Sequence, residues 1–201
     1  TELKSSVRTR GGSESGSPLN NKGEEKMIRV KLEDSVREYA NKQVTNKNFG
    51  NRSKGFNGNK EKQYTGILGE CAVYLALGKE LPTYDSGSVV EDVIINNKKV
   101  DIKSMARNSD MRDNFVHNFV AYQKDSNNDV LIGVNINKKS REAQICAWLP
   151  KEEFLKKARF FEKGTKITRF DGTSFVTGAP HYELEQSEWN QINSVEDLKS
   201  I

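Results

Sequence analysis

Apolar residues follow a helical spacing in the first part of the chain and a strand-like spacing later. Residues 32–44 carry one apolar stripe at helical intervals, formed by Leu32, Val36, Tyr39 and Ala40. Residues 64–78 (YTGILGECAVYLALG) are almost wholly apolar and end at Gly78, a residue type that commonly closes helices. The pattern therefore predicts an amphipathic helix over 32–44 and a buried helix over 64–78.

The rest of the chain contains short segments of strand type and two further helical segments. The expected strands are 88–95, 98–104, 118–123, 130–136, 143–149 and 181–185. Residues 149–164 have the pattern of an amphipathic helix with Pro150 at its start, and residues 194–201 that of a short closing helix. This order predicts one α/β domain in which a central mixed β-sheet is flanked by helices.

The composition narrows the class of protein without identifying it. The 201 residues are 34% hydrophobic and 30% charged, and their formal charge of +4 permits an anionic partner but is common among ordinary soluble proteins. Cys71 and Cys146 are far apart and stand beside apolar residues, so we expect reduced core residues rather than a disulfide or a zinc site. No segment has the pattern of a membrane span or a signal peptide, so we expect a cytoplasmic protein with no membrane partner.

Three regions are expected along the chain. Residues 1–26 contain no aromatic residue and mix Ser, Gly, Asn and charged residues, which predicts a flexible arm. A tag, a processed remnant or part of a larger product would each explain such an arm. Residues 27–63 are expected to hold the N-terminal helix and a basic loop, and residues 64–201 the domain that carries the chemistry.

The expected loop, residues 41–63, is basic and rich in Asn and Gly, with two isolated aromatic residues, Phe49 and Phe56. A flexible basic segment with interleaved aromatic rings is able to bind the backbone phosphates and unpaired bases of a nucleic acid. The alternative is a solvated loop whose phenylalanines pack back onto the core. The residues that we expect to bind nucleic acid are Lys47, Arg52, Lys54, Lys60 and Lys62.

Residues 91–104 (EDVIINNKKVDIKS) predict a β-hairpin with Asn96 and Asn97 as its turn, because Asn tolerates positive φ. In this register Asp92 lies opposite Asp101, whereas a turn one residue later would put it opposite Lys103. Both registers sort the side chains into an apolar face, made of Val93, Ile95, Val100 and Ile102, and a charged face, made of Asp92, Asp101 and Lys103. The apolar face is expected to meet the core, and the charged face is either a catalytic site or a solvated surface.

Glu70 is the one charged residue between Tyr64 and Gly78. Burying an unpaired carboxylate costs roughly several kcal/mol, so such a residue usually has a compensating partner. A cation shared with the hairpin aspartates would supply one, and a structural salt bridge or a solvent-exposed helix edge are the alternatives. Gly66 and Gly69 are expected to let this helix approach a neighbour closely.

Three carboxylates with no His or Cys nearby are hard oxygen ligands, which suit Mg²⁺, with Mn²⁺ able to substitute, rather than Zn²⁺. The expected metal ligands are Glu70, Asp92, Asp101 and the carbonyl oxygen of Ile102. Lys103 is expected to orient an attacking water, with Gln123 as its support from a neighbouring segment. Such a cluster fits hydrolysis of a phosphodiester bond, with Glu70, Asp92, Asp101 and Lys103 as the catalytic residues. His117 is expected to be a surface or structural residue, with substrate contact as the alternative.

These residues resemble the PD-(D/E)XK nuclease superfamily. The matching pieces are Glu70 on the preceding helix, Asp92 at the start of the hairpin, and Asp101-Ile102-Lys103 as the D-x-K element. The arrangement G-x-x-G-E-x-A at residues 66–72, followed by V-D-I-K-S, looks most like small phage and mobile-element members. The resemblance covers roughly residues 64–150 and implies a restriction-endonuclease-like core that cleaves DNA with Mg²⁺. Residue 91 is Glu rather than the Pro of the family name, and Asp85 or Glu91 would replace Asp92 if the first strand were shifted.

The leading hypothesis is therefore a metal-dependent DNA endonuclease of the homing, restriction, junction-resolving or repair type. Cutting both strands ordinarily requires two active sites, so a homodimer or higher oligomer is expected in that case. A second hypothesis is a DNA-binding module that keeps the fold without catalysis and needs no metal. A third is a structural protein with an incidental charged hairpin, in which Glu70 would point away from that hairpin.

Overall fold

The computed structural model describes residues 27–46, 59–84 and 92–201. Several expectations fall outside these ranges and are not addressed by the structure. They are the arm at 1–26, the nucleic-acid-binding role of Lys47, Arg52 and Lys54 with Phe49 and Phe56, and the alternative site residues Asp85 and Glu91.

A six-stranded mixed sheet forms the centre of the described chain. Its strands are β1 Ile28–Lys31, β2 Val93–Ile95, β3 Lys98–Arg107, β5 Val130–Asn137, β6 Glu142–Pro150 and β11 Asn190–Gln191. They lie in the order β1-β6-β5-β3-β2, with β11 paired to β6. The β3–β5 pair is parallel and the other pairs are antiparallel. The expected mixed α/β fold is confirmed, and β1 is a strand that the apolar pattern does not predict.

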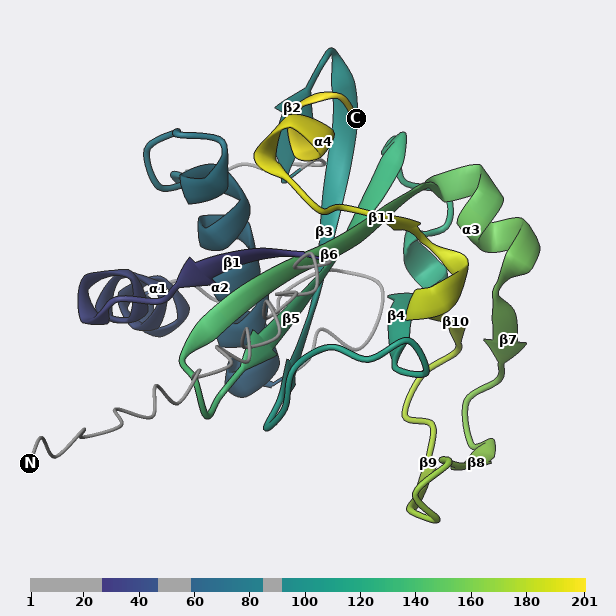
Figure 1. The fold of residues 1–201 in the computed structure, drawn as a ribbon. Helices are drawn as coiled ribbons and strands as arrows, with labels where there is room; N and C mark the ends of the chain where they lie inside the picture. The colour runs from purple at the N-terminus through teal and green to yellow at the C-terminus, as the bar shows by residue number, and fades with distance from the viewer. Residues whose placement is uncertain (1–26, 47–58, 85–91) are drawn as a thin grey trace, which may run out of the picture.

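Two helices, α1 (Asp34–Asn46) and α2 (Lys60–Ala76), pack on one face of this sheet (Figure 1). The helix expected over 64–78 begins earlier because Asn59 caps it: the Asn59 side chain accepts a 3.0 Å hydrogen bond from the Lys62 backbone N–H. The expectation of a loop over 41–63 is therefore wrong at both ends. The boundary expected between residues 63 and 64 lies inside α2.

A second sheet and the helix α3 (Lys151–Lys157) pack on the opposite face (Figure 1). This sheet has the order β4-β10-β7, with β4 at Val116–Val120, β7 at Arg159–Phe161 and β10 at His181–Glu185. The helix expected over 149–164 is too long, because residues 159–161 pair with β10 and so end the helix before Arg159. Trp189 is buried in the core beneath this sheet.

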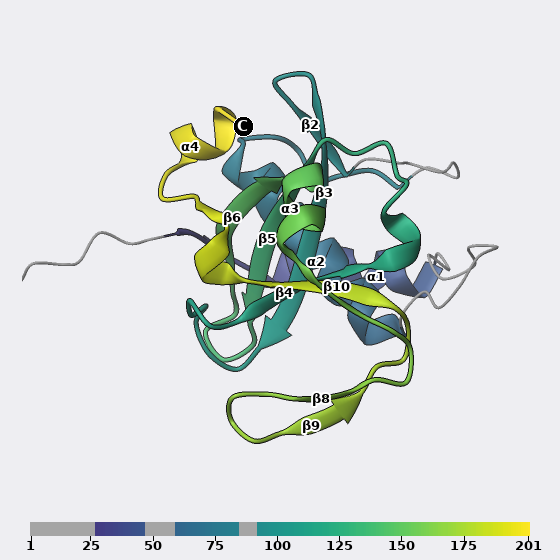
Figure 2. The ribbon, with the colours of Figure 1, turned by 90° about the vertical axis from the view of Figure 1, so that its right-hand side faces the viewer.

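The remaining elements are short. They are η1 Ala121–Gln123, η2 Gln186–Glu188, α4 Val195–Lys199, and the strands β8 Lys166–Thr168 and β9 Ser174–Val176. The β8–β9 pair forms a separate hairpin that projects from the second sheet (Figure 2). Cys71 and Cys146 are buried and free, as expected. Within the described ranges, the structure contains no helix with the length and apolarity needed to cross a membrane.

The β2–β3 hairpin carries most of the candidate site. Asn96 and Asn97 have φ values of 47° and 63°, and Ile95 pairs with Lys98 across the turn. These positive φ values are those of a type I′ turn, whose twist matches the flanking strands. The apolar face of the hairpin, Val93, Ile95, Val100 and Ile102, is buried in the same core as α2. The register with Asp92 opposite Asp101 is thus confirmed, because Val93 pairs with Val100.

Candidate active site

Lys103 is the centre of a polar group on β3. Its Nζ lies 2.7 Å from Asp101 Oδ1 and donates a 2.9 Å hydrogen bond to Gln123 Oε1. It also stands 5.0 Å from the centroid of the Phe119 ring. The side chains of Lys103 and Asp101 are only 14% and 10% exposed, so solvent screens their attraction less than it would on the surface. Strand alternation explains why Asp101 and Lys103 share a face, and η1 brings Gln123 to the same place.

Asp92 is held at the base of the hairpin by three contacts. Its Oδ2 accepts a 2.6 Å hydrogen bond from the Ile102 backbone N–H, and its own N–H donates to the Val100 carbonyl at 2.9 Å. The Tyr74 hydroxyl donates to the Asp92 carbonyl oxygen at 3.0 Å. Burial and then the negative charges of Glu70 and Asp101 raise the pKa of Asp92, while Lys103 and the Ile102 N–H act in the opposite direction. Asp92 is therefore in the electrostatic field of both other carboxylates.

Glu70 lies on α2, which packs closely against β3 beside Gly69. A Cβ added at Gly69 would stand 1.8 Å from the Ser104 Oγ, so any other residue there would force Ser104 to shift. The Tyr84 hydroxyl donates a short hydrogen bond to Glu70 Oε2, and burial followed by the Glu70 charge raises the pKa of Tyr84. The close approach expected at Gly69 is confirmed. The one expected at Gly66 is wrong, since a Cβ there meets nothing within 4 Å.

The structure thus brings Asp92, Asp101, Lys103 and Gln123 together, with Glu70 close enough to influence Asp92. Lys60 and Lys62 stand apart from this group, exposed in the first turn of α2. Two participants that sequence reasoning missed are Tyr74 and Tyr84. Tyr74 belongs to a helix whose apolar pattern already accounts for it, and Tyr84 follows that helix with no periodic signal of its own.

His117 has a structural role rather than a place in this group. It is 1% exposed, and its Nε2 lies 2.7 Å from Gln186 Oε1. Its ring fills the space above Gly133, where an added Cβ would stand 2.5 Å from the ring. Burial lowers the pKa of His117 to about 4, so the ring is neutral near neutral pH.

The oxygen donors suit a hard divalent cation in their chemistry, although each is paired with a protein group as it stands. Asp101 faces Lys103, and Glu70 accepts from Tyr84. Across residues 27–46, 59–84 and 92–201, no three His, Cys, Asp or Glu side chains gather in a way that could hold a metal ion. Burial raises the pKa of Asp92 first, and the charges of Glu70 and Asp101 raise it further, so a nearby cation would relieve part of this effect. For Ile102 the contact found at this site is its N–H to Asp92, not its carbonyl.

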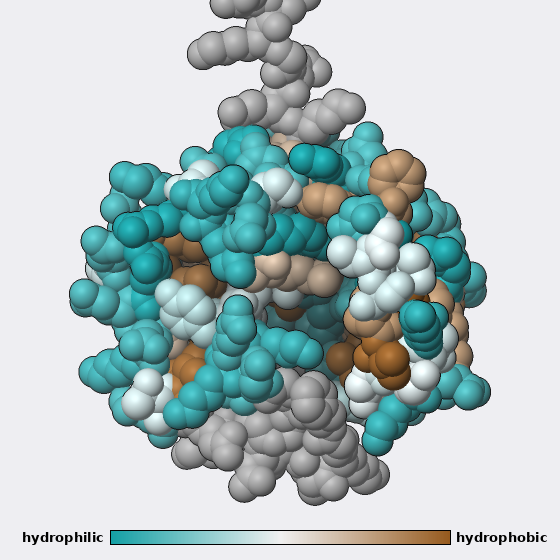
Figure 3. Space-filling model, turned by 90° about the horizontal axis from the view of Figure 1, so that it is seen from below, coloured by the Kyte–Doolittle hydropathy of each residue, from teal (hydrophilic) through white to brown (hydrophobic). Residues whose placement is uncertain are grey.

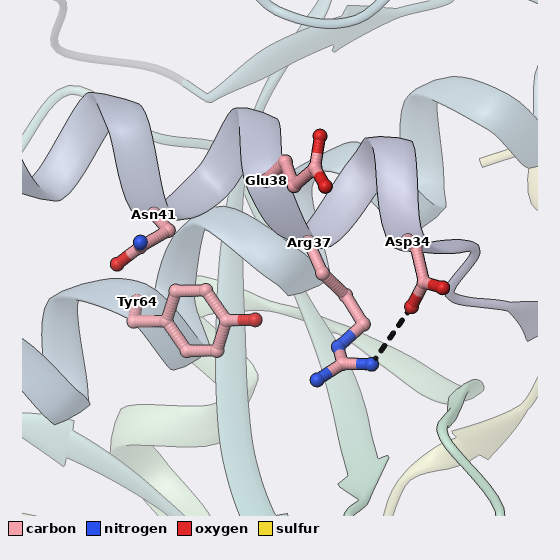
Figure 4. A pocket seen from close by; sticks show the side chains of 5 residues that line it. All are labelled: Asp34, Arg37, Glu38, Asn41 and Tyr64. Atoms are coloured by element: carbon pink, nitrogen blue, oxygen red, sulfur yellow. Dashed lines mark hydrogen bonds and ion pairs between the residues drawn. The ribbon is translucent and has the colours of Figure 1, made fainter.

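A pocket lies elsewhere, between α1 and the start of α2, and Figure 4 shows its lining. Its lining residues are Asp34, Arg37, Glu38, Asn41 and Tyr64. Arg37 Nη1 donates a 3.1 Å hydrogen bond to Asp34 Oδ1. None of the expected catalytic residues lines this pocket, and its open, charged walls are those of a solvated helix surface.

Comparison with protein-family models, with curated proteins and with solved structures finds no match. The chemistry of this chain is therefore argued from the geometry of the site.

Proposed function

We propose that the protein is a Mg²⁺-dependent DNA endonuclease of the PD-(D/E)XK type, with a restriction-endonuclease-like core. The observation that carries this proposal is the Lys103 ammonium held between Asp101 and Gln123, beside Asp92 on the base of the same hairpin. Two carboxylates and a lysine lie on one face of the hairpin, and Glu70 on α2 is close enough to raise the pKa of Asp92. Carboxylates beside a lysine are a side-chain set that can support hydrolysis of a phosphodiester.

The Lys103 ammonium group would donate a hydrogen bond to the substrate. An ammonium group has three N–H donors, of which Asp101 and Gln123 take two. Among the described residues the third donor has no hydrogen-bond acceptor, so it would bind a phosphate oxygen or the attacking water and orient that water toward phosphorus. Because its two protein partners fix the ammonium, Lys103 would stabilise the charge that develops as the phosphorus–oxygen bond breaks.

In the described part of the chain, Glu70, Asp92 and Asp101 do not gather closely enough to hold a metal, so metal binding would require these carboxylates to move together. Asp92, Asp101 and Glu70 supply hard oxygen ligands, and Tyr84 would keep the Glu70 carboxylate oriented toward them. When bound, Mg²⁺ (or Mn²⁺) lowers the pKa of the attacking water and neutralises charge on the phosphate. Lys103 is paired with Asp101, so metal binding would need Asp101 to share its oxygens between the ammonium and the cation.

The test is cleavage of supercoiled plasmid in Mg²⁺ by the wild-type protein and by matched pairs of variants. Asp101→Asn and Lys103→Ala are expected to lose at least about 100-fold in rate, since each removes a charge that acts on the reacting phosphate or water. Lys98→Ala is the control for Lys103, because Lys98 is an exposed lysine on the same strand. Glu70→Gln tests the third proposed metal ligand. Its control is Glu61→Gln, which changes an exposed glutamate on the same helix.

Unchanged cleavage by both Asp101→Asn and Lys103→Ala would end the proposal, as would full cleavage by the wild type in excess EDTA. Comparing nicked with linear product shows whether one or both strands are cut. Sedimentation of the active species then tests the homodimer that double-strand cutting would require.

A non-catalytic DNA-binding module is the second candidate function. The observation that favours it is the direct pairing of Asp101 with Lys103, which satisfies both charges without a metal. This function predicts salt-sensitive DNA binding that is the same with EDTA and with Mg²⁺, together with no cleavage.

A further inference from the structure

The β8–β9 hairpin carries an exposed aromatic ring on its turn. The turn is closed by a 2.7 Å bond from the Arg169 N–H to the Thr173 carbonyl, and Gly172 adopts a φ of 82°. Asp171 Oδ1 accepts from the Thr173 N–H at 2.9 Å, which fixes the turn further. Phe170, at the tip, is 97% exposed.

The tip of this hairpin is anchored to the body of the protein by a buried ion pair. Arg169 Nη1 and Nη2 each lie 2.6 Å from one oxygen of Glu183, whose side chain is 0% exposed. His181 Nε2 lies 2.9 Å from Glu183 Oε1 and completes the arrangement. A bidentate pair with a buried carboxylate is costly to separate, so it holds the hairpin in one orientation.

The base of the hairpin is tied down as well. The Thr177 hydroxyl donates to the Glu162 carbonyl at 2.5 Å and accepts from the Thr165 N–H at 2.9 Å. The hairpin is therefore fixed at both ends, and the exposure of Phe170 is a property of an ordered segment.

Phe170 differs from the other exposed aromatic residues of this region. Phe175 lies against the Arg169 guanidinium, 4.9 Å from its Cζ, and Phe160 packs on Tyr182 with ring centroids 5.0 Å apart. Figure 3 looks onto this side of the molecule, and brown and pale atoms stand among teal ones on the right, where the hairpin lies. Phe170 is the most exposed apolar residue of this region, where Phe160, Phe175 and Val176 are also exposed. One projecting ring is too small for a protein interface, but it has the form of a wedge that enters a stack of bases.

The charge of the surrounding segment fits a polyanion. Residues 156–178 carry six Lys or Arg against one Glu and one Asp. The exposed basic residues are Lys156, Lys157, Arg159, Lys163 and Lys166. Lys157 is paired with Glu153 at 2.5 Å, and Arg159 lies 3.9 Å from Glu185. Lys163 and Lys166 are therefore better placed than these two to contact a phosphate. Positive charges beside a projecting ring are the combination that binds phosphates and stacks on bases.

We propose that the β8–β9 hairpin is a DNA-contacting arm that stacks Phe170 on a base while Lys163 and Lys166 contact the flanking phosphates. This inference rests on the proposed function only in taking DNA as the partner, and it does not depend on cleavage. It gives the protein a second contact with DNA, built on the second sheet and separate from the carboxylate–lysine site.

The test is binding of a DNA duplex that carries 2-aminopurine at one position, in EDTA so that no cleavage occurs. Phe170→Ala is expected to weaken binding by about 5- to 150-fold, the range for loss of one stacked base, and to remove the fluorescence change of 2-aminopurine. Phe170→Trp should restore both, because it keeps an aromatic face. Val176→Ala is the matched control, since Val176 is a 62% exposed apolar residue of the same hairpin away from the tip.

Lys163→Gln with Lys166→Gln should lower the slope of log affinity against log salt concentration by about 2, one for each lost phosphate contact. Equal affinity and fluorescence for wild type and Phe170→Ala would overturn the proposal. A change in oligomeric state on Phe170→Ala, without a change in DNA affinity, would also overturn it and assign the ring to a second copy of the chain. Wild-type binding that depends on Phe170, combined with no cleavage in Mg²⁺, would reject the endonuclease and leave this inference standing.

Discussion

At the residue scale, Gly69 sets the distance between α2 and β3. We expect Gly69→Ala to destabilise the fold by about 1–3 kcal/mol, because its Cβ would stand 1.8 Å from Ser104 Oγ and 2.9 Å from Ser104 Cβ. Gly66→Ala is the control on the same helix. It meets nothing within 4 Å and should stabilise by up to about 1 kcal/mol through helix propensity. Urea unfolding of the three proteins measures the difference, and equal stability of the two variants would contradict the explanation.

The candidate site could be predicted from the sequence only where its geometry is local. Strand alternation places Asp101 and Lys103 on one face, and the Asn-Asn turn fixes Asp92 opposite Asp101. The hydrogen bond from Tyr84 to Glu70 joins residues whose relation depends on how the chain returns after α2. The sequence pattern contains no signal for such a contact, because loop paths are decided by packing rather than by periodicity.

At the element scale, the β2–β3 hairpin depends on its two-residue turn. Asn97→Gly is expected to stabilise the protein by a few tenths to about 1 kcal/mol, because glycine is the preferred second residue of a type I′ turn. Asn97→Val should destabilise it by about 1–2 kcal/mol, since a β-branched residue is strained at the φ of 63° found there. Thermal unfolding followed by circular dichroism checks the order Gly, Asn, Val. A valine variant as stable as the wild type would contradict the turn assignment.

Other elements show where local patterns fail. Residues 149–164 keep a helical spacing of apolar residues, yet Arg159–Phe161 is a strand because β10 offers it a partner. β1 is only four residues long, and its strand conformation comes from pairing with β6. In contrast, β5 and β6 were predictable because a continuous apolar run is what a strand buried on both faces requires. Whether a short segment forms a helix or a strand is decided by its tertiary pairing, whereas for a long segment its own composition decides it.

At the scale of the whole molecule, stability depends on pH through two histidines whose pKa values are shifted in opposite directions. Burial lowers the pKa of His117 from 6.5 to about 4, so its contribution is complete above pH 6.5 and is lost as pH falls toward 4. The hydrogen bond to Glu183 raises the pKa of His181, so its contribution is complete below 6.5 and is lost as pH rises through that raised value. A hydrogen bond from Arg29 lowers the pKa of Asp110 to about 2, and the stability that this bond contributes is lost only as the pH falls toward 2.

We therefore expect the stability difference between the wild type and His117→Asn to shrink by about 3 kcal/mol between pH 6.5 and pH 4. The physical reason is that the folded wild type must either leave His117 neutral or bury its charge, and the variant faces neither cost. Urea unfolding at a series of pH values measures this difference, and comparison with the variant cancels the contributions of the other groups. A difference that stays constant over this range would show that His117 takes up a proton in the folded protein as readily as in the unfolded one.

The pairing of β1 with β6 has a consequence for how the chain is made. Arg29 lies beside Gln144 in the finished sheet, so a ribosome must complete α1, α2 and three further strands of that sheet before β1 finds its neighbour. Contacts between such distant segments slow folding toward milliseconds or seconds, in contrast to the microseconds of small helical bundles. During that interval β1 is a nascent strand without a partner, and strands in that condition are the ones that chaperones commonly shield from aggregation.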